Sequence, residues 1–189
     1  MNTTQWLQTK YLPIPLIALM VLTRYHHFGD ALHLPDASLA VFFFAGFYRK
    51  PALLAFLLIL AGLIDYLAIA NGTSAYCISP AYVFMIPTYG VMWLAGRYCG
   101  RYKTFDRIGL PLNVGMLMLA STAAFLISNG SFYLLSGRFE EVALSAYIAG
   151  GLQYYLPYVG STLLYVAAGY ALVKLLAFLP ALQSRHTSA

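Results

Sequence analysis

Charged residues are scarce in this chain, and their scarcity excludes an ordinary soluble domain. Only 9% of the 189 residues are Asp, Glu, Lys or Arg, whereas soluble domains contain roughly 25%. Hydrophobic residues make up 61% of the chain, and the mean hydropathy is +0.72. These values predict an all-α integral membrane protein. Apolar segments and short connections use the whole length, so we expect residues 1–189 to form a single transmembrane domain.

The motifs of the common enzyme classes are also missing. The sequence has no Ser-His-Asp arrangement, no HExxH zinc motif, no glycine-rich phosphate loop and no pair of carboxylates on one helix face. Hydrolytic chemistry is therefore not indicated. Because the chain has no nucleotide-binding motif, any ATP-driven activity would depend on a partner protein that binds ATP. The basic residues, which give a net charge of +5, are scattered at span ends, and this pattern does not favour nucleic acid as a partner.

Cysteine is rare as well, and the two cysteines cannot pair with each other. Cys77 lies in a charge-free connection between two apolar stretches, and Cys99 follows the second of them. At about 1.5 Å of rise per residue, a helix over Ser79–Gly96 separates the two by roughly 25 Å, whereas a disulfide needs Cα atoms within about 7 Å. The outer side of a membrane is oxidising, and proteins there usually either lack an unpaired cysteine or use it for a function. Cys77 is therefore the main candidate for chemistry.

Six segments are apolar enough to be candidate transmembrane helices. They are Leu12–Phe28, Leu32–Tyr48, Pro51–Ala70, Ser79–Gly96, Ile108–Ser128 and Leu152–Phe178. The third, fifth and sixth reach spanning length unaided. The first two have apolar cores of only about 11 residues, which leaves their ends open and allows one of them to be tilted, broken or re-entrant.

Lysine and arginine predict the orientation of these spans. Nine of the eleven lie on one side of the six-span arrangement, and only Arg24 and Arg138 lie on the other. The nine are Lys10, Arg49, Lys50, Arg97, Arg101, Lys103, Arg107, Lys174 and Arg185. Because basic connections stay in the cytoplasm, both termini are predicted to be cytoplasmic, and the first, third and fifth connections outside.

The three outer connections supply most of the candidate ligand-binding residues. The fifth, residues 129–151, is the longest. Connections that exceed the length needed to join two helices are often functional, so three of them on one face predict a lidded cavity open to the outside. The residues singled out in these connections are His26, His27, Tyr76, Cys77, Phe132, Tyr133 and Arg138.

Asp65 is an ionisable residue inside the third span, about five residues from its outer end. Such a residue costs roughly 2.5–3.5 kcal/mol at mid-helix on insertion scales and less near an interface. We favour a role in the cavity, where Asp65 would accept hydrogen bonds from ligand amides or hydroxyls. The alternative is an interfacial carboxylate paired with Arg24 or with tyrosines.

The histidines do not predict a haem site. His26 and His27 are adjacent and would point about 100° apart on a helix, so they cannot both bind one metal. One of them could still face the cavity, although an interfacial histidine in water is an equal alternative. Most of the tyrosines fit an interfacial aromatic belt. Tyr82, five residues after Cys77, is the exception that we place against a flat ligand over the thiol.

A single thiolate makes a poor site for a free metal ion, although thiolates are soft ligands suited to transition metals. One thiolate is sufficient when the metal arrives already chelated and needs only an axial ligand. Cobalt in a corrin ring and iron in a porphyrin both fit this description.

The arrangement resembles the substrate-binding S-components of energy-coupling-factor (ECF) vitamin transporters, and within them the BtuM-type cobalamin transporters of Gram-negative bacteria. The resemblance rests on the six-span layout, the pair His26-His27, Asp65, and the stretch from Cys77 to Tyr82. It implies a bundle in the bacterial inner membrane that takes up cobalamin or its precursor cobinamide. It also implies that Cys77 is the axial ligand of the corrin cobalt. Slow removal of cyanide from cyanocobalamin would be an expected side activity of that thiolate.

One departure from ordinary S-components concerns their partner. Those proteins dock on a shared transmembrane subunit through small residues four apart in the first helix, and Ala18 is the only small residue in Leu12–Leu22. We therefore expect the chain to act alone or through another interface. Two alternatives to cobalamin uptake stay open, namely a transporter for another small vitamin and a membrane thiol or redox enzyme that uses Cys77.

Overall fold

The computed structural model describes residues 13–25, 35–48, 51–101 and 109–186, with the backbone alone for Pro13, Tyr25, Cys77, Gly109 and residues 173–186. Every regular element in these ranges is helical, which confirms the predicted helical class for this part of the chain. The elements are α2 (Pro13–Tyr25), α3 (Ser38–Phe47), α4 (Pro51–Ala70), the short 3₁₀ turns η2 (Ala75–Cys77) and η3 (Pro80–Phe84), α5 (Met85–Cys99), α6 (Gly109–Leu135) and α7 (Leu144–His186).

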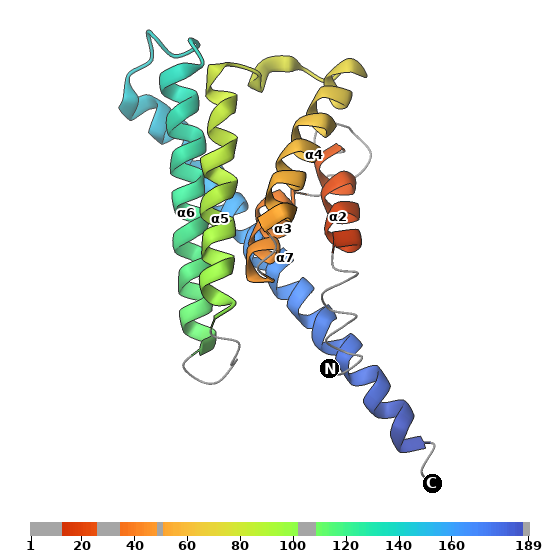
Figure 1. The fold of residues 1–189 in the computed structure, drawn as a ribbon. Helices are drawn as coiled ribbons and strands as arrows, with labels where there is room; N and C mark the ends of the chain where they lie inside the picture. The colour runs from red at the N-terminus through yellow and green to blue at the C-terminus, as the bar shows by residue number, and fades with distance from the viewer. Residues whose placement is uncertain (1–12, 26–34, 49–50, 102–108, 187–189) are drawn as a thin grey trace.

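The six α-helices alternate in direction along the chain (Figure 1). The ends of α4 and α6, the turns η2 and η3, and the beginning of α7 lie together at one end of the bundle, which we call the upper end after its position in Figure 1. The ends of α3 and α5 and the beginnings of α4 and α6 lie at the lower end. The third connection and the connection between α6 and α7 therefore share one end, as predicted.

Within the part of the chain that the structure describes, two helices are long and apolar enough to cross a membrane, Pro51–Ala70 and the part of α6 from Leu110 to Leu135. The bounds of α4 agree with the predicted third span. The second predicted span is wrong at its beginning, because helix α3 starts only at Ser38. Residues 35–37 are not helical, and the Asp36 carboxylate accepts the backbone N–H of Ser38 (2.9 Å) in the first turn of α3.

Two further bounds differ from the prediction. The α-helical part of the fourth span starts at Met85, after the 3₁₀ turn that holds Tyr82. Helix α6 continues to Leu135 and α7 starts at Leu144. The fifth connection is thus short, and Phe132 and Tyr133 belong to a helix.

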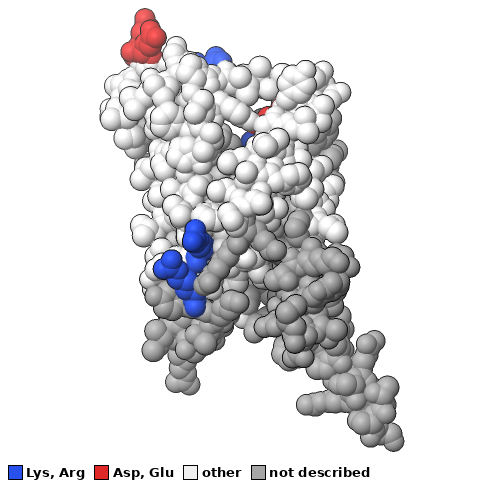
Figure 2. Space-filling model, viewed as in Figure 1, with Lys and Arg blue, Asp and Glu red and all other residues white. Residues whose placement is uncertain are grey.

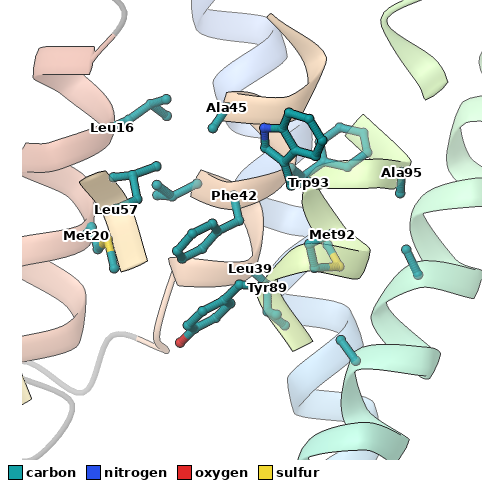
Figure 3. Packing of buried hydrophobic residues seen from close by; sticks show 14 of the residues in the cluster. Leu16, Met20, Leu39, Phe42, Ala45, Leu57, Tyr89, Met92, Trp93 and Ala95 are labelled. Atoms are coloured by element: carbon teal, nitrogen blue, oxygen red, sulfur yellow. The ribbon is translucent and has the colours of Figure 1, made fainter. Parts of the chain in front are cut away.

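The core lies around α3, which is buried along nearly its whole length. Phe42 stacks on Tyr89 of α5 with ring centroids 4.1 Å apart. Met20 of α2 and Leu57 of α4 lie on the other side of Phe42 (Figure 3), and both are fully buried. The short α3 therefore forms the centre against which α2, α4 and α5 pack.

The contact between α3 and α5 depends on glycine. A Cβ atom on Gly46 would lie 1.9 Å from the carbonyl oxygen of Trp93, and one on Gly96 would lie 1.9 Å from the carbonyl oxygen of Phe43. Small residues allow two helix backbones to approach this closely. Gly46 of α3 and Gly96 of α5 therefore allow the short distance between the two helices.

We expect Gly46→Ala to lower the thermal unfolding midpoint in detergent. The added methyl group must push α3 and α5 apart, and overpacking of this kind costs about 1–3 kcal/mol. Gly90→Ala in α5 is the matched control, because its Cβ would meet no atom within 4 Å. Equal midpoints for the two variants would contradict the close packing of α3 on α5.

Candidate functional site

A buried ion pair joins α2 to α4 near the upper end. Arg24, at the end of α2, donates from Nε to Oδ1 of Asp65 (2.7 Å) and from Nη2 to Oδ2 (2.6 Å). The two residues are only 5% and 7% exposed. This two-bond geometry is the strongest that a guanidinium forms with a carboxylate. It compensates part of the cost of removing both charges from water.

A second carboxylate approaches the same guanidinium. Nη1 of Arg24 lies 3.2 Å from Oδ2 of Asp36 and 3.2 Å from Oγ of Ser38. Asp36 is held in place because its Oδ1 accepts the hydroxyl of Ser38 (2.6 Å). Thr23 contributes by accepting the backbone N–H of Ala37 (3.1 Å). One positive and two negative charges therefore meet at the beginning of α3.

Two tyrosines complete this group. Tyr82 donates its hydroxyl to Oδ2 of Asp65 (2.7 Å), and the hydroxyl of Tyr89 accepts a short hydrogen bond from Nη1 of Arg24. We call Arg24, Asp36, Ser38, Asp65, Tyr82 and Tyr89 the charge cluster. Its members come from α2, α3, α4, η3 and α5, so the cluster fixes these elements relative to one another.

The charge cluster borders a cavity of about 310 Å³. Its lining residues are Arg24, Asp36, Asp65, Ala81, Tyr82, Phe84, Met85, Ser128, Asn129, Ser131 and Phe132. Figure 2 shows a hollow in the upper half of the molecule with acidic and basic atoms at its base. We call this space the upper cavity. A second cavity of about 310 Å³ adjoins it, because both are lined by Asp36, Met85 and Ser128.

The segment that carries Cys77 borders the same region. The residues that line a small pocket include Asp65 and Tyr82 together with Ser74 and Ile78. Cys77 lies between the last two in the sequence and ends the turn η2. The backbone there is ordered by hydrogen bonds: Oγ of Ser74 accepts the N–H of Tyr76 (3.2 Å), and the carbonyl of Ala75 accepts that of Ile78 (2.9 Å). The sulfur of Cys77 lies outside the described part.

Aromatic side chains close the upper end above the upper cavity. The rings of Tyr76 and Phe132 lie 5.8 Å apart and join η2 to α6, while the guanidinium of Arg138 lies 4.2 Å from the centre of the Tyr76 ring. Tyr133 and Phe139 continue this aromatic bridge, with centroids 6.1 Å apart. Tyr133 is anchored by its hydroxyl, which donates to the carbonyl of Val142 (2.7 Å).

The structure brings most of the candidate residues together. Asp65, Tyr82 and Phe132 line the upper cavity. Tyr76 contacts Phe132, and Arg138 lies over the ring of Tyr76. His26 and His27 lie outside the described residues. Among the described side chains, no group of three His, Cys, Asp or Glu residues is placed to hold a metal ion.

The sequence did not reveal the central position of Arg24. The sequence suggested Arg24 only as one of the alternative partners of Asp65. The structure shows the pair of Arg24 and Asp65. Asp36 and Tyr89 were missed as members of the cluster. Arg24 is the only lysine or arginine assigned to the first and third predicted connections, and an isolated arginine together with an aspartate in an apolar helix was the available signal.

No model of a known protein family matches this chain, and no curated protein matches it either.

Proposed function

We propose that this chain is a corrinoid-binding uptake protein of a bacterial inner membrane, with six spans and both termini in the cytoplasm. Cobalamin or cobinamide would bind at the upper end, with the sulfur of Cys77 as axial ligand of the cobalt. The observation that carries the proposal is the position of the Cys77 segment. It borders the same small pocket as Asp65 and Tyr82, which also line the upper cavity.

The polar lining supports a ligand rich in amides, such as a corrinoid. Both oxygens of Asp65 are already engaged by Arg24 and Tyr82. Asp36 keeps 27% of its side chain exposed, compared with 9% for Asp65. Asp36, together with Ser128 and Asn129 on α6, is therefore the better acceptor for ligand amides. Asp65 would act by holding Arg24 and Tyr82 in position.

The size of the upper cavity determines which contact would have to open before a corrinoid could bind. Pockets for drug-sized ligands measure roughly 300–1,000 Å³, and a corrinoid is larger than such ligands. At about 310 Å³, the upper cavity admits an edge of the ring and not the whole molecule. Binding would therefore separate Tyr76 from Phe132 and open the aromatic bridge between η2 and α6. The same volume favours a second candidate, an S-component-like transporter for a smaller vitamin.

An absorbance spectrum separates these two candidates. The protein would be purified in detergent, incubated with cobinamide and freed of unbound ligand on a sizing column. We expect a coloured protein whose visible bands differ from those of aqueous cobinamide, because sulfur replaces water on the cobalt. A colourless protein would contradict corrinoid binding and leave the smaller vitamin as the better candidate.

Reporter fusions test the proposed topology. We expect reporters at both termini to be cytoplasmic, and one inserted in the connection at residues 136–143 to be outside. The reason is the distribution of basic residues, with Arg97 and Arg101 at the lower end and Arg138 at the upper end. A C-terminal reporter on the outer side would contradict the six-span topology and move Cys77 to the other side.

A further inference from the structure

A separate, apolar cavity lies near the lower end of the bundle, away from the charge cluster and from the two adjoining cavities beside it. Its volume is about 300 Å³, and α3, α5, α6 and α7 all contribute to its wall. Most of the wall is aliphatic or aromatic, including Phe43, Phe47, Leu117 and Val166. None of the described residues that line it carries a charge. We call this space the lower cavity.

Apart from the tyrosines Tyr48 and Tyr170, one polar side chain interrupts this apolar wall. Asn113 of α6 is 8% exposed, and neither its amide nitrogen nor its amide oxygen has a hydrogen-bond partner among the described residues. Other polar side chains of the same helix are satisfied locally: the hydroxyl of Ser121 donates to the carbonyl of Leu117 (2.8 Å), and the amide of Asn129 to that of Phe125 (3.0 Å). A buried amide with both groups unpaired is destabilising, so its presence calls for a partner that the described residues do not supply.

We propose that the lower cavity binds a single-chain lipid amphiphile with an uncharged head group that both donates and accepts a hydrogen bond. The carboxamide of Asn113 offers an NH₂ group that donates and a carbonyl oxygen that accepts, so an alcohol or a protonated carboxylic acid can bond to both of its unpaired groups. An ionised head group is disfavoured because the described wall has no charge to pair with it. The apolar wall takes the alkyl chain.

The size and position of the lower cavity favour this ligand over the other occupants. About 300 Å³ is at the lower end of the range for small-ligand pockets, so it accommodates one short chain and not a two-chain phospholipid. A helix is about 10 Å across and does not fit between four helices that already contact one another. Leu110 and Val114, which line the cavity, are 50% and 41% exposed on α6. If α6 crosses the membrane as proposed, the cavity is open to hydrocarbon.

The side-chain amide of Asn113 can be observed directly. The asparagines of the chain are Asn2, Asn71, Asn113 and Asn129, so protein labelled with [15N]asparagine in phosphatidylcholine nanodiscs gives few side-chain NH₂ signals. The pair that disappears in Asn113→Leu is that of Asn113. We expect 1-decanol to move this pair downfield in a saturable manner. Decane lacks the hydroxyl and decyl sulfate carries a charge, so neither should move it.

Stability provides an independent readout. We expect Asn113→Leu to unfold at a higher temperature than the parent without additive, because it removes a buried unpaired amide. The parent should gain several degrees from 1-decanol through mass action, whereas Asn113→Leu should gain much less. Ala167→Leu keeps Asn113 and fills part of the cavity, so it should also lose the response to 1-decanol.

Several outcomes would overturn the proposal. An Asn113 signal that does not respond to 1-decanol would show that the amide is satisfied by water or within the protein. Equal responses to decane and 1-decanol would show apolar filling without recognition by Asn113. Equal stabilisation of the parent and Asn113→Leu by 1-decanol would place its binding elsewhere. None of these outcomes bears on corrinoid binding, because Asn113→Leu lies outside the upper cavity and should leave the cobinamide spectrum unchanged.

Discussion

Cys77→Ser is expected to abolish the sulfur-ligated spectrum of the bound corrinoid. Serine keeps nearly the volume of cysteine but replaces a soft sulfur ligand with a hard, protonated oxygen, which is a poor ligand for the cobalt. The backbone around η2 should be retained, because its hydrogen bonds come from Ser74 and Ala75 and not from the thiol. The visible spectrum of the variant with cobinamide should therefore resemble that of aqueous cobinamide, whether or not some ligand stays bound.

Cys99→Ser is the matched control for this change. Cys99 is fully buried at the end of α5 and lines the lower cavity, at the end of the bundle opposite η2. We expect it to leave the corrinoid bands in place. A parent and a Cys77→Ser variant with the same bands would contradict cobalt–thiolate ligation, even if both proteins bind the vitamin.

The sequence predicted helices where apolar character and breaker residues coincide. Helix α4 has the predicted bounds because Pro51 favours its first turn and the polar residues after Ala70 end its apolar run. The prediction ended this helix too early, at Ser128, because Asn129 and Ser131 are polar residues that are common in loops. In the structure their side chains bond to the carbonyls of Phe125 and Ser128 within the same helix, so polar residues there do not end it.

The candidate site was predictable only in part, for a related reason. Asp65 stands out because a carboxylate in an apolar run is costly, and Tyr82 stands out by its nearness to Cys77. Asp36 and Tyr89 carry no such signal. They reach Arg24 only because α3 packs at the centre of the bundle, and no local spacing in the sequence encodes that packing.

The buried pair of Arg24 and Asp65 should be strongly coupled. Arg24→Leu leaves Asp65 and Asp36 without their cation, and Asp65→Leu leaves Arg24 with Asp36 as its only anion among the charge cluster. Removing one partner of a buried pair costs about 3–5 kcal/mol. We expect each single variant to unfold at a clearly lower temperature in detergent. The double variant Arg24→Leu/Asp65→Leu should cost much less than the sum of the two, because the two deeply buried charges are removed together and only the partly exposed Asp36 keeps its charge. Arg101→Leu, at an exposed position, is the control for the loss of one arginine.

The same double variant distinguishes two roles of Asp65, namely holding Arg24 in position and contacting the ligand directly. Single substitutions confuse loss of binding with loss of folding, whereas the double variant should keep the fold and remove the carboxylate. If Asp65 acts only by holding Arg24 and α2 in place, the folded double variant should bind cobinamide with at most a modest loss, since Asp36, Ser128 and Asn129 still line the upper cavity. Loss of the cobinamide spectrum from a stable double variant would instead assign Asp65 or Arg24 a direct contact with the ligand. Strictly additive costs of the two single variants would show that the pair is not coupled and would contradict the charge cluster itself.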